Sequence, residues 1–372
     1  MIDVLAVADV LVSHAVKKHG HEIDLIAYYG SRARGDYRED SDLDIFYTPA
    51  EGKNPPVGRT FLLEGLLFDF WAIRWDLLEG FATGRVRGWA FAPGLVHQAK
   101  VLYARSEAQA SRFAQLQQTI QELQQPEARP VMIGRALEMF GRVLGHLGNL
   151  HLAAAEGDIT DVRYAGWLVV QSAWECLALA NQTFFERGLF KGLAELQKLT
   201  HRPPHMARRI ATISTSPDPH QVLNAAEELA LGTRRILREF QASLPPRTTV
   251  PAQFEQVYPE LKDEVTKLLE ACAQGDPVVA SAGAWSLQHE LTMMLSQTGP
   301  GPGRRDFNLY REFASPYRGL GFPDLLLGTA AGLDDLAQQT RLLDERLRQW
   351  LRGESVDLGE FETLEELEAA LA

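Results

Sequence analysis

A short stretch near the N-terminus brings together residue types that could bind phosphates and a metal ion. Gly30-Ser31 follows an apolar run, residues 23–29, that predicts a strand, and Asp42 and Asp44 open a second apolar run. A glycine at the end of a strand lets the backbone turn sharply, so that its amides can approach an anion. The Ser31 hydroxyl can cap the next helical turn or donate to a phosphate oxygen. One nucleoside triphosphate could contact both groups, which predicts nucleotidyl transfer.

The two aspartates are expected on one face of the second strand, because side chains alternate along a strand. Carboxylates two residues apart repel each other unless they are hydrated or share a cation, and Mg²⁺ that also binds substrate phosphates is the natural partner. A third carboxylate would complete a two-metal site. The best candidate is Asp69, the only charge in the apolar run 66–73. Two alternatives stay open: Asp42 caps a turn while Asp44 lies on the surface, or Asp69 is an ordinary acid on an edge strand.

Three arginines follow the Gly-Ser pair and could neutralise the triphosphate. They are Arg32, Arg34 and Arg38. Ion pairs with neighbouring acids explain each of them equally well. Those acids are Asp36, Glu39 and Asp40.

This pattern resembles the nucleotidyltransferase superfamily that includes DNA polymerase β, and within it the minimal and aminoglycoside-modifying branch. The matching motifs are Gly30-Ser31 with Gly35, Ser41-Asp42-Leu43-Asp44, and the later Asp69, within residues 1–105. The resemblance implies that Asp42 and Asp44 bind Mg²⁺ and that Asp69 completes a two-metal site or acts as the base. It also implies that Gly30 and Ser31 hold the β- and γ-phosphates of ATP.

Aminoglycoside-modifying relatives often take a general base from a helical domain. Here the predicted helix 162–187 offers Glu175 on a polar stripe, which could face either a cleft or water. Glu138 and Glu186 are weaker candidates for the same role.

The elements that must position these residues predict an α+β N-terminal domain, with a mixed sheet flanked by helices, followed by an all-α helical region. The resemblance implies that the first of these is a nucleotidyltransferase domain. The expected domains are 1–105, a helical bundle over 106–248, and a second helical region over 249–372 that ends in an acidic tail. The expected strands are 23–29, 43–47, 61–63 and 66–73, with a short apolar element at 95–103. The expected helices are 1–20, 75–81, 106–125, 131–155, 162–187, 189–199, 221–244, 254–274, 278–298 and 325–351.

Composition restricts the partners. The net charge of −12 makes a nucleic-acid substrate unlikely, because duplex binding needs clustered cations, and it suits a small or cationic acceptor better. No apolar run approaches the length of a membrane span. Cys176 and Cys272 show no metal-ligand or disulfide spacing, which favours buried thiols in a cytoplasmic protein, with a homodimer possible.

We therefore expect Mg²⁺-dependent transfer of AMP from ATP to a hydroxyl of a small, aminoglycoside-like acceptor. One alternative is a protein acceptor, modified on Tyr, Ser or Thr as by antitoxin-like nucleotidyltransferases. The other is a nucleotide-binding module without catalysis.

Overall fold

The computed structural model describes residues 3–39, 41–86, 88–187, 194–246, 248–299 and 308–371. The chain forms two compact units, Met1–Arg238 and Glu239–Ala372. The first unit contains the sheet and the candidate site, whereas the second is helical throughout its described elements.

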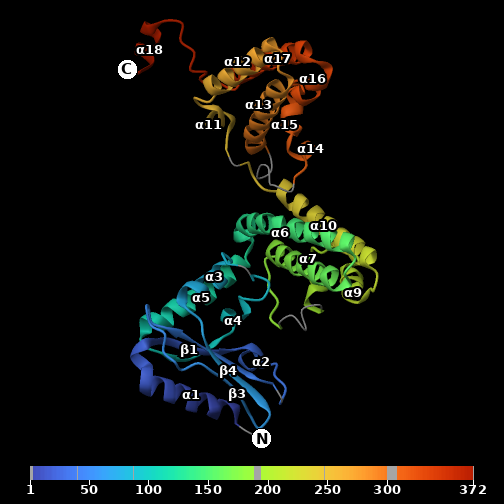
Figure 1. The fold of residues 1–372 in the computed structure, drawn as a ribbon. Coiled ribbons are helices and arrows are strands. Elements are labelled where there is room, and N and C mark those ends of the chain that lie inside the picture. The colour runs from blue at the N-terminus through green and yellow to red at the C-terminus, as the bar shows by residue number, and fades with distance from the viewer. Residues whose placement is uncertain are drawn as a thin grey trace. The chain divides into compact units, whose positions relative to one another are not determined.

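A five-stranded mixed sheet builds the N-terminal part of the first unit (Figure 1). Its strands are β1 (Ile23–Tyr29), β2 (Leu43–Pro49), β3 (Arg59–Leu63), β4 (Leu66–Ala72) and β5 (Lys100–Ala104). They lie in the order β3-β4-β2-β1-β5, in which β2 and β4 run parallel and the other neighbours are antiparallel. The turn between β3 and β4 uses Glu64 and Gly65 at φ angles of 52° and 80°, as a tight hairpin requires.

Different helices cover the two faces of this sheet, as Figure 1 shows. They are α1 (Val4–His19), α3 (Trp75–Thr83), α4 (Gly94–His97) and α5 (Glu107–Leu123). Ala8 of α1 belongs to a buried cluster with Leu43 and Ile45 of β2. On the other face, Phe46 of β2 contacts Phe113 of α5, with ring centroids 6.0 Å apart. The alternation expected along β2 is therefore confirmed, and it places Asp44 on the face opposite α1.

The rest of the first unit is a bundle of helices. It contains α6 (Arg129–Glu156), α7 (Ile159–Ala180), α9 (Met206–Thr215) and most of α10 (Pro219–Ala242). Helices α6 and α7 pack along each other (Figure 1). Asp158 caps α7 by accepting the amides of Thr160 and Asp161. Every residue of α7 from Ser172 to Ala180 is buried, so this half of the helix presents no face to water.

The second unit has its own hydrophobic core. Its helices are α11 (Val250–Phe254), α12 (Tyr258–Gln274), α13 (Pro277–Thr298), α14 (Tyr310–Phe313), α15 (Ser315–Gly319), α16 (Leu325–Ala331), α17 (Leu333–Gly353) and α18 (Leu364–Leu371). Gln288 on α13 is 1% exposed and binds both Tyr310 and the start of α16. Its side-chain oxygen accepts the Leu325 amide at 2.6 Å, which ties α16 to the centre of the unit.

The fold class is confirmed: a mixed sheet with helices precedes a helical region. Three details of the prediction are wrong. The helix expected over 162–187 ends at Ala180, because Asn181 bonds to the carbonyls of Leu177 and His201 and Gln182 has a φ of 52°. The helix expected over 254–274 begins only at Tyr258, and the helix expected over 325–351 is broken into two at Gly332, which has a φ of 117°.

Some expected elements differ in other ways. The apolar element at 95–103 is divided between α4 and β5, and α9 was not expected as a separate helix. The predicted helix 189–199 falls partly outside the described residues, which resume at 194. No helix in the described part of the chain is long and apolar enough to cross a membrane. Cys176 and Cys272 are both free and buried, as expected.

Candidate active site

The turn after β1 has the conformation that its two glycines allow. Gly30 has a φ of 78° and begins α2 (Gly30–Arg34), which ends at Gly35 with a φ of 84°. The amides of Gly35 and Asp36 both donate to the Ser31 carbonyl, at 2.9 and 3.1 Å. A Cβ atom on Gly30 would lie 3.0 Å from Oδ2 of Asp44. The absence of a side chain at position 30 therefore brings the turn against the carboxylate.

Three carboxylates lie near one another, at the start of β2 and in the middle of the neighbouring β4. Asp44 and Asp69 are partners in the parallel register of these strands, and Asp42 lies just before β2. The Asp69 carboxylate accepts a hydrogen bond of 2.6 Å from the hydroxyl of Thr60, its cross-strand partner on β3. β4 lies between β3 and β2, so the site of Asp69 is not an edge strand.

Asp44 is the electrostatic centre of this group. Burial, then the negative charges of Asp42 and Asp69, raise its pKa to about 7, while Arg34 opposes the shift. Tyr29 stands opposite Asp44 on β1, and its hydroxyl accepts a hydrogen bond of 3.1 Å from Trp71. Burial and the charge of Asp44 raise the pKa of Tyr29 well above its usual value, so the phenol stays neutral. A cation between the carboxylates would relieve the repulsion.

The fit of a divalent metal follows from this donor set. Among the residues that the structure describes, no group of three or more His, Cys, Asp or Glu side chains is close enough to form a complete metal cage. Asp42 and Asp44 nevertheless line one cavity, and Asp69 lies close enough to shift the pKa of Asp44. Mg²⁺ typically takes only one or two carboxylates and completes its shell with water and substrate phosphates. The residues present therefore fit a metal that arrives with a nucleotide.

Asp42, Asp44 and the Gly-Ser turn line a common cavity of about 420 Å³, called here the nucleotide pocket, whereas Asp69 is not among its lining residues. Its lining residues are Tyr29, Gly30, Ser31, Arg34, Asp36, Arg38, Ser41, Asp42, Asp44, Phe91, Gly94, Leu95, Phe185, Glu186 and Arg187. The structure thus brings together Gly30, Ser31, Arg34, Asp42 and Asp44 of the predicted site. Phe91 and Phe185 form an aromatic wall, with ring centroids 5.5 Å apart. Such a wall suits packing against a base or sugar ring.

The predicted arginines have different surroundings. Arg32 is used within its own loop, where it donates to the carbonyls of Ser41 and Asp42 and covers the ring of Tyr37. Arg34 lines the nucleotide pocket and pairs with Asp36 at 3.2 Å. Asp40, another of the acids considered as arginine partners, lies outside the described residues.

Arg34 and Asp36 also bind the turn after β1 to residues 186 and 187, which lie far along the chain. Arg34 donates to the backbone carbonyl of Glu186 at 2.9 Å, and Arg187 pairs with Asp36 at 3.1 Å. Sequence reasoning missed Arg187 and Phe185 as site residues, because their helix was expected to continue past Ala180. The end of α7 and the extended residues after it bring them to the pocket.

Glu175 is placed away from the nucleotide pocket. Glu175 is 8% exposed, and its carboxylate accepts hydrogen bonds from the backbone amides of Gly88, Trp89 and Ala90, at distances down to 2.5 Å. Burial raises its pKa, against the effect of these bonds. Glu175 was expected on a polar stripe facing a cleft or water, but this part of α7 is buried within the protein. Glu175 does not line the nucleotide pocket. Of the weaker candidates, Glu186 lines the pocket, whereas Glu138 is exposed on α6.

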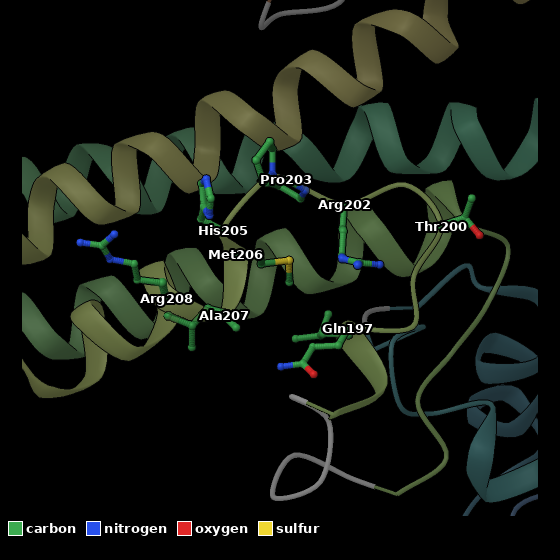
Figure 2. A pocket seen from close by; sticks show the side chains of 11 residues that line it. Gln197, Thr200, Arg202, Pro203, His205, Met206, Ala207 and Arg208 are labelled. Atoms are coloured by element: carbon green, nitrogen blue, oxygen red, sulfur yellow. The ribbon is translucent and has the colours of Figure 1, made fainter.

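A larger cavity of about 550 Å³ lies elsewhere in the first unit. Figure 2 shows side chains of the loop before α9 and of its first turn, among them Arg202, His205 and Arg208. The residues that line this cavity include no carboxylate. It therefore lacks the chemistry for a phosphate-bound metal.

Comparison with known families agrees with this site. Residues 12–75 match the family described as nucleotidyltransferase domain, and residues 110–243 match the KNTase C-terminal domain, which is kanamycin nucleotidyltransferase-like. The chain belongs to the nucleotidyltransferase superfamily and is a transferase of the nucleotidyltransferase type. The first of these matches spans the Gly-Ser turn and all three aspartates.

Other comparisons are more distant. The chain is similar to a crystal structure of a nucleotidyltransferase-like protein from Exiguobacterium sibiricum, with 14% identity and a TM-score of 0.37. The similarity covers 71% of this chain and 91% of the other. No curated protein matches the chain.

Proposed function

We propose that this protein transfers the AMP group of ATP to a hydroxyl of a small-molecule acceptor, with Mg²⁺ as the cofactor. The observation that carries the proposal is the nucleotide pocket, where the Gly30-Ser31 turn, Arg34, Asp42 and Asp44 face one space. Each of these groups suits a different part of a metal-bound triphosphate. The match to a KNTase C-terminal domain supports a small acceptor that carries hydroxyl groups.

Binding of the nucleotide follows from the charges of the pocket. The turn at Gly30 and Ser31 would hold the β- and γ-phosphates through backbone amides and the Ser31 hydroxyl. Arg34 would contribute positive charge from the same loop. Asp42 and Asp44 would hold Mg²⁺, with Asp69 beside them, and the metal would neutralise charge on the phosphates during transfer.

In the proposed reaction the acceptor hydroxyl attacks the α-phosphorus of ATP. A new bond forms between the acceptor oxygen and the α-phosphorus, while the bond from that phosphorus to the bridging oxygen of the β-phosphate breaks. Pyrophosphate leaves with the electron pair of the broken bond. The hydroxyl proton passes to a carboxylate base.

Glu186 is the carboxylate that we assign to this proton. It lines the nucleotide pocket, and its backbone carbonyl is held by Arg34. Its Oε1 accepts a hydrogen bond of 3.1 Å from Gln98, which leaves Oε2 to receive a proton. Glu175, by contrast, has both oxygens engaged by backbone amides, so we propose that it positions the 88–90 loop.

The test is transfer of label from ATP carrying ³²P at the α-phosphate, with kanamycin A and with lysate protein as separate acceptors. We expect Mg²⁺-dependent labelling of kanamycin A that a chelator abolishes. Asp42→Asn combined with Asp44→Asn should reduce it by roughly a thousandfold, since metal stabilisation of the transition state is worth several kcal/mol. Labelling of lysate protein alone would identify a protein acceptor. Unchanged transfer in the double variant would refute the metal site.

A further inference from the structure

One row of polar side chains crosses the sheet at the nucleotide pocket. Asp44 on β2 is paired with Tyr29 on β1 and with Asp69 on β4, and Asp69 is paired in turn with Thr60 on β3. Residues that are paired across neighbouring strands lie on the same face of a sheet. Four strands therefore each contribute one polar group to this row, on the face opposite α1.

The two ends of the row are bonded differently. At one end, the Thr60 hydroxyl donates its proton to the Asp69 carboxylate at 2.6 Å. At the other end, the Tyr29 hydroxyl accepts a hydrogen bond from Nε1 of Trp71 at 3.1 Å. Among the residues that the structure describes, the Tyr29 hydroxyl proton has no acceptor. Thr60 thus uses its proton within the sheet, whereas the proton of Tyr29 is left for another partner.

The Tyr29 side chain is held in place by its neighbours. Its ring packs against Phe46 of β2, with ring centroids 6.1 Å apart. Trp71 lies on the same face of β4 as Asp69, two residues further along, and reaches Tyr29 across β2. An indole N–H can only donate, so Trp71 fixes the phenol oxygen as its acceptor and leaves the O–H of Tyr29 to donate elsewhere.

Tyr29 lies where the phosphates of a bound nucleotide are expected. It lines the nucleotide pocket and directly precedes Gly30 and Ser31, which line it too. Its side chain is only half-buried. Burial raises the pKa of Tyr29, and the negative charges of the three aspartates of the site raise it further. Since these charges act on the phenol, its hydroxyl lies close to the carboxylates proposed to hold Mg²⁺.

A phosphate oxygen is the acceptor that suits this position. A phenol can donate to an anion without bringing a charge of its own, and hydrogen bonds to charged acceptors are the stronger ones. Phosphates that share a metal ion with Asp42 and Asp44 would bring such oxygens next to Tyr29.

We propose that Tyr29 is a nucleotide-binding residue, whose hydroxyl donates a hydrogen bond to a phosphate oxygen of the triphosphate. Trp71 is then a positioning residue, which acts through Tyr29 and does not touch the nucleotide. The phosphate-binding turn accordingly begins one residue before Gly30. The inference rests on the proposed function, since it needs a triphosphate in this pocket.

Calorimetry on the full chain can test this proposal, with α,β-methylene-ATP and Mg²⁺ as the probe. Tyr29→Phe keeps the ring against Phe46 and removes only the hydroxyl. It should weaken binding of the probe by about tenfold or more, as for a hydrogen bond to a charged group. Tyr28→Phe is the matched control, because Tyr28 is the neighbouring tyrosine on the other face of β1, packed against the cluster that contains Ala8. It should bind the probe as the unchanged protein does.

A double-mutant cycle tests the role of Trp71. Trp71→Phe should weaken binding of the probe by a few-fold, because the phenol remains but its oxygen is no longer held. In the Tyr29→Phe background the same substitution should cause no further loss, since Trp71 acts only through the hydroxyl. An equal loss in both backgrounds would show a separate structural effect and refute the positioning role.

Phosphorus NMR of the bound probe shows which part of the nucleotide Tyr29 contacts. Tyr29→Phe should shift at least one of the three phosphorus resonances, whereas Tyr28→Phe should shift none. Urea unfolding checks that each variant is folded under the conditions of the titration. The proposal is overturned if Tyr29→Phe binds the probe as tightly as Tyr28→Phe does, or if it leaves every phosphorus resonance in place. Unchanged protein that does not bind the probe would instead refute the proposed function.

Discussion

Replacing Asp44 with asparagine should make the protein more stable while it abolishes transfer. The folded protein raises the pKa of Asp44 from 3.8 to about 7, through burial and the charges of Asp42 and Asp69. Each pKa unit corresponds to 1.36 kcal/mol, so ionised Asp44 costs up to about 4 kcal/mol of folding free energy. Asparagine has the same shape and no charge. The gain should be about 2–4 kcal/mol, because partial exposure screens some of the repulsion.

The pH dependence of this gain has a definite sign. Where the folded-state pKa of an acid is raised, the protonated form favours folding, and that contribution is lost as the pH rises. Below pH 3.8 both states are protonated and the substitution should have little effect. The advantage of Asp44→Asn should grow between pH 4 and pH 7 and then stay constant.

The assay is urea unfolding of the full chain without divalent ions at pH 4, 6 and 8, followed by tryptophan fluorescence. Asp9→Asn is the matched control, since Asp9 is an exposed carboxylate on α1. Adding Mg²⁺ with a non-hydrolysable ATP analogue should stabilise the unchanged protein far more than the Asp44 variant. If Asp44→Asn is no more stable than Asp9→Asn at pH 8, the electrostatic reasoning about this site is refuted.

Four further substitutions separate the roles of neighbouring residues. Gly30→Ala should impair ATP binding, measured by ATP titration, because its Cβ would lie 3.0 Å from Oδ2 of Asp44. Gly35→Ala is the comparison, since Gly35 has a φ of 84° but no atom lies within 4 Å of its Cβ. It should cause only about 1–2 kcal/mol of backbone strain, measured by urea unfolding. Glu175→Ala should destabilise the protein by about 3 kcal/mol or more in urea unfolding, because it leaves three backbone amides unpaired, and equal stability would contradict its positioning role. Glu186→Gln should instead lower kcat by about 100-fold or more with unchanged stability and KM for ATP, and a normal kcat would exclude it as the base.

Local patterns in the sequence were sufficient to predict four of the five described strands and the Gly-Ser and aspartate motifs. Strand β1 has the predicted bounds, and the register of β2 and β4 places Asp44 and Asp69 side by side. These features depend on short-range alternation and on glycine conformations, which are written in neighbouring residues. The metal-binding roles of the aspartates stay a prediction for the experiments above.

The contribution of the helical bundle could not be predicted in the same way. Whether Glu175 faces a cleft, water or protein depends on how α7 packs, and helical periodicity does not reveal which face is covered. Phe185, Glu186 and Arg187 reach the pocket only because the helix ends at Ala180, and that end is fixed by contacts of Asn181 with distant residues. Tertiary contacts, not local propensity, determine this side of the site.

The most direct test of the central claim is to compare transfer from ATP labelled with ³²P at the α-phosphate and at the γ-phosphate. Nucleotidyl transfer in the pocket formed by the Gly30 turn and Asp44 predicts that the α-label appears on the acceptor. The γ-label should be released entirely as pyrophosphate. Transfer of the γ-label to the acceptor, or transfer of neither label in the presence of Mg²⁺, would contradict the account.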